Sequence, residues 1–127
     1  MTKRLLIVDD EPDIRRIIQV SLEEIAGWQV STAESGSEAL VTVKTGHWDA
    51  ILLDISMPDM NGFDVFHKLQ SDPVTQQIPI VLLTAKVQPS DRRRFAQMGV
   101  AGVIAKPFNP INISNEVAQT LGWELKP

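Results

Sequence analysis

Residues 49–62 read Asp49-Ala50-Ile51-Leu52-Leu53-Asp54-Ile55-Ser56-Met57-Pro58-Asp59-Met60-Asn61-Gly62. The apolar run from Ile51 to Leu53 is typical of a short strand buried on both faces, and turn residues follow it after Asp54. In an open α/β sheet, ligands bind outside the carboxyl ends of the strands, so Asp54 lies where chemistry can take place. On this segment alone, a carboxylate at a strand end is more often a helix cap or a turn former. The role of Asp54 therefore depends on the residues that the fold brings to it.

The length and composition indicate one ordinary globular domain. The chain has 127 residues, of which 43% are hydrophobic and 22% charged, so we expect residues 1–127 to form a single domain with no output domain. The sequence shows no signal-peptide pattern and no apolar run of about 18 residues, and we expect a cytoplasmic protein that does not insert into membranes. The absence of Cys excludes disulfides, thiolate catalysis and Cys-ligated zinc. A net charge of −4 argues against direct binding of nucleic acid.

Outside the opening stretch, apolar runs alternate with helical patterns. Besides the strand that ends at Asp54, strands are predicted over residues 5–8, 28–33, 80–83 and 100–105. Helices are predicted from Pro12 to Gly27, from Ser35 to Gly46, from about Phe63 to Leu69, from Pro89 to Gly99 and from Ile111 to Leu121. This alternation predicts a three-layer, doubly wound α/β fold, in which a five-stranded parallel sheet is covered on both faces by five helices.

Every strand that is apolar enough to be central ends in a polar residue. These residues are Asp9, Asp10, Asp54, Thr84 and Lys106. Because the carboxyl ends of parallel strands meet at one edge of a sheet, we expect these side chains to converge in one cleft. Three carboxylates at close quarters repel one another unless a cation lies among them. Mg²⁺ fits best, since it prefers oxygen ligands and the site contains no His or Cys.

The same residues supply what phosphoryl transfer requires. Lys106 offers a positive point charge and Thr84 a hydroxyl donor, and the main chain after Asp54 and after Thr84 offers two N–H donors. Asp54 is the natural oxygen nucleophile, and its product would be an acyl phosphate. The residues therefore predict a phosphoacceptor site.

At these positions the chain resembles a receiver domain of two-component response regulators, of the single-domain type. The resemblance extends from Leu5 to about Leu121. It rests on Asp9-Asp10-Glu11-Pro12, on Asp54 with Met57-Pro58-Asp59-Met60-Asn61-Gly62, on Thr84-Ala85 and on Lys106-Pro107-Phe108. It implies a flavodoxin-like fold with strand order 2-1-3-4-5 and a cis peptide bond before Pro107.

The resemblance also implies a role for each site residue. Asp54 would accept a phosphoryl group from a sensor histidine kinase or a histidine phosphotransfer protein. Asp10, Asp54 and the Ile55 carbonyl would ligate Mg²⁺, and Asp9 would act through a metal-bound water. The protein would be a signalling phosphoacceptor, not an enzyme. It would act by binding an unknown downstream protein or by passing the phosphoryl group on. The cognate kinase and the oligomeric state stay open.

The phosphoryl group itself would be held and flanked by a further set of residues. Lys106, Thr84 and the N–H groups of Ser56 and Ala85 would bind its oxygens. Ser56 and Lys86, each two places after a site residue, would flank it and tune its loss.

One position departs from the family pattern. Three residues before the Lys, receiver domains usually carry a Tyr or Phe that swings inward on phosphorylation, and here the residue is Val103. A β-branched side chain is stiff at χ1 and too short to move between exposed and buried positions. Two interpretations stay open: the signal passes through Thr84 and the main chain alone, or the protein switches weakly.

Three other classes fit these residues less well. A phosphatase or mutase with an aspartyl-phosphate intermediate would carry its nucleophile on the first strand in an Asp-x-Asp pattern and would need a lid, but this chain has adjacent Asp9-Asp10 and no insertion. A scaffold that is never phosphorylated would be favoured by loss of Asp54, Lys106 or the acidic pair, and none is lost. A flavin-binding protein needs Gly, Ser and Thr after the first strand, where this chain is acidic.

Overall fold

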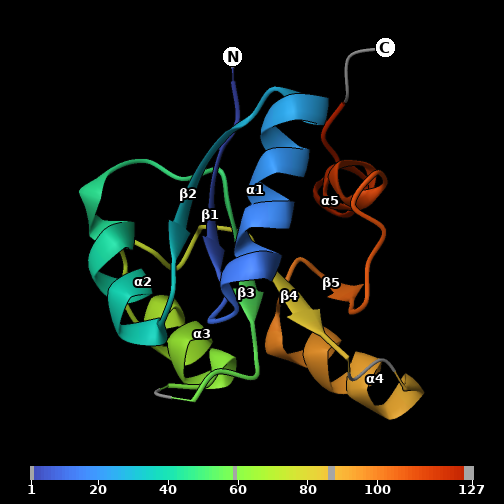
Figure 1. Ribbon diagram of the computed structural model, residues 1–127. Coiled ribbons are helices and arrows are strands. Elements are labelled where there is room, and N and C mark those ends of the chain that lie inside the picture. Colours follow the sequence, from blue (N-terminus) through green and yellow to red (C-terminus); the bar gives the residue numbers. More distant parts are fainter. Residues whose placement is uncertain (1, 59, 86–87, 125–127) are drawn as a thin grey trace.

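The computed structural model describes residues 2–58, 60–85 and 88–124 and contains one parallel sheet of five strands in the order β2-β1-β3-β4-β5 (Figure 1). The strands are β1 (Arg4–Val8), β2 (Gln29–Ala33), β3 (Ala50–Asp54), β4 (Ile80–Thr84) and β5 (Gly102–Ala105). The helices are α1 (Pro12–Ala26), α2 (Gly36–Thr42), the short 3-10 helix η1 (Val43–Thr45), α3 (Gly62–Gln70), α4 (Pro89–Met98) and α5 (Ile113–Leu121). The predicted fold class and strand order are confirmed. Among the described residues, no helix has the length and apolar character needed to cross a membrane.

The sheet has a hydrophobic core on each face. Successive side chains of a strand point to opposite faces, and in β3 Ile51 and Leu53 join the core beneath α2, α3 and α4, whereas Ala50 and Leu52 join the core beneath α1 and α5. All four residues are at most 1% exposed. The central strand is therefore buried on both faces, as its apolar run predicted.

The register of the strands aligns their carboxyl ends. Val8 of β1 pairs with Leu53 of β3, and the next residue along β3, Asp54, pairs with Leu83 of β4. Thr84 of β4 pairs with Ala105 of β5. Asp9, Asp54, Thr84 and Lys106 consequently lie at the same edge of the sheet.

Local signals begin and end the helices beside this edge. Pro12 occupies the first turn of α1, and Gly27 ends that helix with a φ of 72°, a left-handed conformation that Gly adopts without strain. At α3, the Asn61 side chain accepts a hydrogen bond from the Asp64 N–H at 3.0 Å, which caps the helix. Pro12 and the Asn61 cap mark where α1 and α3 start relative to the strand ends.

Several predicted boundaries were wrong by a few residues. The second strand begins at Gln29 because the Trp28 N–H instead donates to the Leu22 carbonyl at the end of α1. The fifth strand begins only at Gly102, and α2 ends at Thr42 and continues as η1. The last helix begins at Ile113, because the side chain and carbonyl of Asn109 accept the N–H groups of Ile111 and Asn112 and form a turn. Ile111 is thus outside the helix and 71% exposed. The peptide bond before Pro107 is cis, as predicted.

Gly62 allows α3 to begin directly against the end of β3. A Cβ at this position would lie 2.5 Å from the Ile55 Cα and 2.6 Å from the Asp54 carbonyl oxygen. These main-chain atoms cannot rotate away, so we expect Gly62→Ala to lower the free energy of unfolding by about 1–3 kcal/mol in urea denaturation. Gly46→Ala is the control, because its Cβ would meet the movable end of the Arg4 side chain, and we expect a change within about 0.5 kcal/mol. Equal losses in both variants would contradict this explanation.

Candidate functional site

Three carboxylates meet at the carboxyl edge of the sheet. Asp9 follows β1 and is completely buried, Asp54 ends β3 and is 2% exposed, and Asp10 is half-buried. Each offers one oxygen atom, and these three atoms all lie within 4.8 Å of one another. The structure thus brings together the acidic residues that the sequence predicted to converge.

Asp9 is held by contacts on several of its atoms. Its Oδ1 accepts the Glu11 N–H at 2.9 Å, and its Oδ2 accepts a hydrogen bond from the Lys106 Nζ, also at 2.9 Å. Its own N–H donates to the Ala33 carbonyl of β2 at 3.2 Å. Both carboxylate oxygens therefore have a fixed direction.

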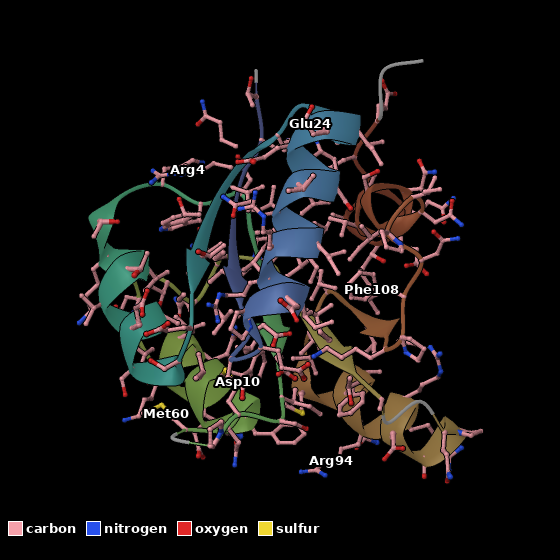
Figure 2. All side chains as sticks on the ribbon, in the orientation of Figure 1. Arg4, Asp10, Glu24, Met60, Arg94 and Phe108 are labelled. Carbon is pink, nitrogen blue, oxygen red and sulfur yellow. The ribbon has the colours of Figure 1, made fainter. Side chains whose placement is uncertain are left out.

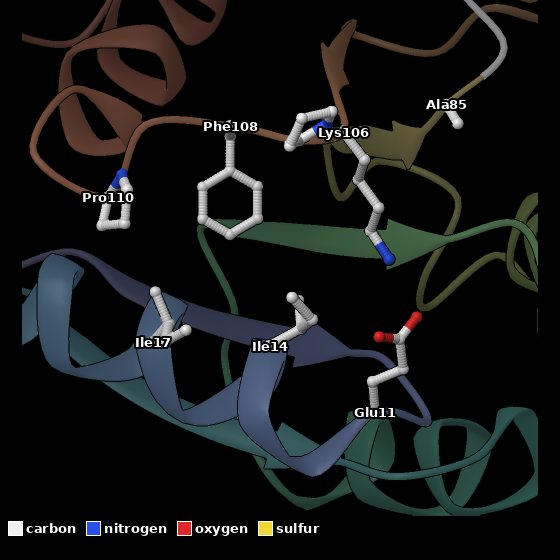
Figure 3. Close-up of a pocket in the computed structure, with 8 residues that line it drawn as sticks. Glu11, Ile14, Ile17, Ala85, Lys106, Phe108 and Pro110 are labelled. Atoms are coloured by element: carbon white, nitrogen blue, oxygen red, sulfur yellow. The ribbon is translucent and has the colours of Figure 1, made fainter.

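Lys106 places its ammonium between two of the carboxylates. The Nζ lies 2.9 Å from Asp9 Oδ2 and 3.5 Å from Asp54 Oδ1, and the Lys106 N–H donates to the Thr84 carbonyl at 2.9 Å. Burial acts to lower the pKa of Lys106, but the hydrogen bond to Asp9 and the charges of Asp9, Asp54 and Glu11 outweigh it, so the pKa is raised. Figure 3 shows the Glu11 carboxylate facing this ammonium. Lys106 therefore stays positively charged at neutral pH.

Asp54 lies in an environment that opposes its ionisation. Burial is the largest cause that raises the pKa of its carboxyl above the ordinary value. The charges of Asp9 and Asp10 raise it further, whereas the Ser56 N–H, which donates to Asp54 Oδ1 at 3.1 Å, and the charge of Lys106 lower it. A further cation would relieve this repulsion.

The donor set fits magnesium. All three converging side chains are carboxylates, which are hard oxygen ligands, and Mg²⁺ is commonly held by one or two carboxylates together with water and phosphate. Two of the three are buried, and the charges of Asp9 and Asp10 add to burial in raising the pKa of Asp54, against the opposing charge of Lys106. The residues present therefore suit a small divalent cation.

The other predicted site residues lie around these carboxylates. The buried Thr84 ends β4, and the exposed Ala85 and Ser56 follow β4 and β3. The Ile55 carbonyl accepts the Gly62 N–H at 3.2 Å, so one of its two lone pairs is already engaged. Lys86, predicted to flank the phosphoryl group, and Asp59 of the loop motif lie outside the described residues.

Val103 lies within β5, three residues before Lys106. Its side chain is half-buried and packs against the core that contains Phe95, on the face of the sheet covered by α4. The Val103 side chain, which replaces the usual Tyr or Phe, is therefore packed against the core.

Sequence patterns did not reveal two features of the site. The Arg15 Nη1 donates to the Asp9 carbonyl at 2.8 Å, a contact with a main-chain atom that no motif indicates. A groove also opens beside Lys106 between α1 and the segment before α5; besides Lys106 its lining includes Glu11, Ile14, Ile17, Phe108 and Pro110 (Figure 3).

Comparison with known proteins identifies the family to which the chain belongs. Residues 5–118 match the family model described as "Response regulator receiver domain". The chain belongs to this family. Receiver domains are signalling phosphoacceptors that interact with histidine kinases or phosphotransfer proteins, and they are generally not classed as enzymes.

Relatives of known sequence and structure agree with this assignment. The receiver domain is 38% identical over 108 residues to the phosphate regulon transcriptional regulatory protein PhoB of Pseudomonas aeruginosa, covering 85% of this chain and 47% of that protein. It is 37% identical over 105 residues to the probable transcriptional regulatory protein TcrX of Mycobacterium tuberculosis, covering 83% of this chain and 44% of that protein. The chain thus spans about half the length of the curated relatives it matches.

Solved structures give the same result. The chemotaxis response regulator of Vibrio cholerae superposes with a TM-score of 0.87 at 30% identity, covering 94% of this chain and 99% of that one. A putative response regulator from Chloroflexus aurantiacus gives a TM-score of 0.85 at 30% identity, covering 96% and 99%. The receiver fold therefore extends over nearly the whole of this chain.

Removing the Asp54 charge should stabilise the protein in the absence of divalent cations. Its raised pKa means that the folded state holds the proton more tightly than the unfolded state, so stability falls as pH rises from the ordinary carboxyl pKa through the raised one. We expect Asp54→Asn to raise the Tm at neutral pH by roughly 4 °C, equivalent to about 1 kcal/mol, and by much less near pH 4.

Thermal unfolding followed by circular dichroism measures this difference across the pH range. Glu24→Gln is the control, because Glu24 is an exposed carboxylate at the opposite end of α1 from Asp10 (Figure 2). Its Tm should stay close to that of the wild type at each pH. A lower Tm for Asp54→Asn at neutral pH would contradict the predicted repulsion.

Proposed function

We propose that this receiver domain is a magnesium-dependent phosphoacceptor, in which Asp54 takes a phosphoryl group from a sensor histidine kinase or a histidine phosphotransfer protein. The observation that carries the proposal is the arrangement around Asp54. This buried carboxylate lies within 4.8 Å of oxygens of Asp9 and Asp10, and 3.5 Å from the Lys106 ammonium. The Asp54 oxygen nucleophile, the Lys106 ammonium and the candidate metal site thus lie next to one another.

Asp10 and Asp54 would hold the magnesium ion, and Asp9 would act through a water molecule. Magnesium, when bound, neutralises negative charge on the phosphoryl oxygens. We predicted the Ile55 carbonyl as a further ligand. Since that oxygen already accepts the Gly62 N–H, the adjacent Ser56 carbonyl is a second candidate for the same position.

The transfer is a displacement at phosphorus. An Asp54 carboxylate oxygen forms a bond to phosphorus while the bond from phosphorus to the donor imidazole nitrogen breaks; the imidazole keeps the electron pair and takes a proton from solvent. The Lys106 ammonium, the Thr84 hydroxyl and the N–H groups of Ser56 and Ala85 would donate to the phosphoryl oxygens. The Ser56 N–H already points to Asp54, to which it donates at 3.1 Å.

The groove beside Lys106 suits the docking of the phosphodonor protein. Its apolar wall includes Ile17, which is 40% exposed, and Phe108, and it opens at Lys106 and Ala85 next to the phosphoacceptor (Figure 3). Val20, 43% exposed, continues the apolar surface along α1. A protein that carries phosphohistidine must approach Asp54 from the strand ends, and this surface adjoins that approach.

The remaining expectations concern the whole protein. We propose that residues 1–127 act as one receiver domain in the cytoplasm, without membrane insertion and without direct contact of this domain to nucleic acid. Phosphorylation adds negative charge at Asp54, and the output would be binding of a downstream protein or onward phosphotransfer.

Acetyl phosphate tests the acceptor directly. We expect intact-mass measurement to show a single phosphate adduct that forms with Mg²⁺ and not in EDTA, and that is absent from Asp54→Asn. Asp64→Asn is the control, because it removes an exposed carboxylate from the first turn of α3 and should be labelled like the wild type. An adduct on Asp54→Asn, or none on folded wild type with either acetyl phosphate or phosphorylated kinases, would refute the proposal.

A negative charge placed in the groove should impair docking of the phosphodonor protein without affecting the reactivity of Asp54. We expect Ile17→Asp to slow phosphotransfer from the fastest donor in a panel of phosphorylated histidine kinases by about tenfold, while labelling by acetyl phosphate is unchanged. Val41→Asp is the control, because Val41 is a 69% exposed apolar residue of α2, on the other face of the sheet. Equal transfer rates for Ile17→Asp and Val41→Asp would show that the donor docks elsewhere.

A further inference from the structure

Arg15 contacts the main chain of the acidic pair. It lies in the first turns of α1, and its side chain is only 16% exposed. Its Nη1 donates to the Asp9 carbonyl at 2.8 Å, and its Nη2 lies 3.9 Å from Oε2 of Glu34, just after β2. The Glu34 side chain is 69% exposed, so this ion pair is weak, and the carbonyl is the partner that fixes the guanidinium.

Asp10 has little support of its own. The Asp9 carboxylate is held by Glu11 and Lys106, and that of Asp54 by Ser56 and Lys106. Among the described residues, the Asp10 carboxylate accepts no hydrogen bond and forms no ion pair. Its direction therefore depends on its own rotamer and on the main chain on either side of it.

The Asp9 carbonyl belongs to the peptide unit that joins Asp9 to Asp10. Peptide units are planar, so a hydrogen bond that fixes this carbonyl also fixes the orientation of the Asp10 amide and limits the direction of the Asp10 side chain. Arg15 supplies this bond from α1, one turn beyond the acidic pair. Arg15 can therefore influence the orientation of the Asp10 carboxylate without contacting it.

We propose that Arg15 is a positioning residue, which directs the Asp10 carboxylate into the cation site through the Asp9 carbonyl. This inference rests on the proposed magnesium site. Residues that orient metal ligands typically change metal affinity by roughly 10-fold to 100-fold when they are removed.

The positive charge of Arg15 would weaken magnesium binding, whereas its positioning of Asp10 would strengthen it. A guanidinium that contacts the main chain of the acidic pair repels an incoming cation, so removal of the charge alone should strengthen magnesium binding. Positioning predicts weaker binding in the same variant. The sign of the change in Kd therefore separates the two roles.

The test is the Mg²⁺ Kd by isothermal titration calorimetry, at a temperature where circular dichroism shows each variant to be folded. Arg15→Met removes the donor and the charge but keeps most of the side-chain length. Arg16→Met removes the same charge one residue along, from an exposed side chain. We expect the Kd of Arg15→Met to be about tenfold above that of Arg16→Met, and Arg15→Lys, which keeps a donor, to lie closer to the wild type.

A second readout separates positioning from general damage. Saturating Mg²⁺ should restore the rate at which acetyl phosphate labels Arg15→Met to nearly that of Arg16→Met, because only metal affinity is affected. If Arg15→Met does not fold, the Mg²⁺ Kd values of Arg15→Gln and Arg16→Gln are compared in its place.

The outcomes distinguish this inference from the proposed function. A Kd for Arg15→Met equal to or below that of Arg16→Met, with wild type that binds Mg²⁺, would overturn the role of Arg15 alone. Wild type that binds no Mg²⁺, or binds it as well after Asp10→Asn, would overturn the proposed metal site and this inference with it.

Discussion

The clustering of three carboxylates, two of them buried, at one edge of the sheet is the constraint on which this structure depends. Asp9 and Asp54 are almost completely inaccessible to solvent, and the register that pairs Val8 with Leu53 leaves them side by side. Burial of like charges opposes folding. The two cores beneath the helices, whose strand residues are nearly all buried, hold the strand ends together against this repulsion. The sheet thus serves as a rigid support for a site that is unfavourable by itself.

Lys106 offsets only part of this charge. Its ammonium is shared between Asp9 at 2.9 Å and Asp54 at 3.5 Å, and it has no such contact with Asp10. Three carboxylates lie beside one ammonium, and the charges of Asp9 and Asp10 add to burial, the largest cause, in raising the pKa of Asp54. The same arrangement supports the proposed function, because clustered carboxylates attract a cation and the Lys106 ammonium lies 3.5 Å from Asp54, the proposed phosphoacceptor.

The convergence of these residues could be predicted from the sequence because it follows from a simple geometric rule. Apolar runs locate the strands, parallel strands align their carboxyl ends, and the polar residue after each run must then lie at that edge. For Asp9, Asp54, Thr84 and Lys106 the rule depends on the register alone, not on side-chain rotamers. Errors of one or two residues in the predicted start of a strand, such as the inclusion of Trp28 in β2, leave the predicted carboxyl end of that strand unchanged.

The residues that support the site could not be predicted in this way, because they contact main-chain atoms. Arg15 donates to the Asp9 carbonyl, and the Gly62 N–H donates to the Ile55 carbonyl. Every residue has a carbonyl, so its presence gives no signal, and its direction depends on dihedral angles that residue types fix only loosely. The turn that removes Ile111 from α5 has the same origin, in the Asn109 side chain and carbonyl. Residue patterns therefore identify which side chains form the site. The orientation of the main chain at the site determines which further residues can hydrogen-bond to it and orient those side chains.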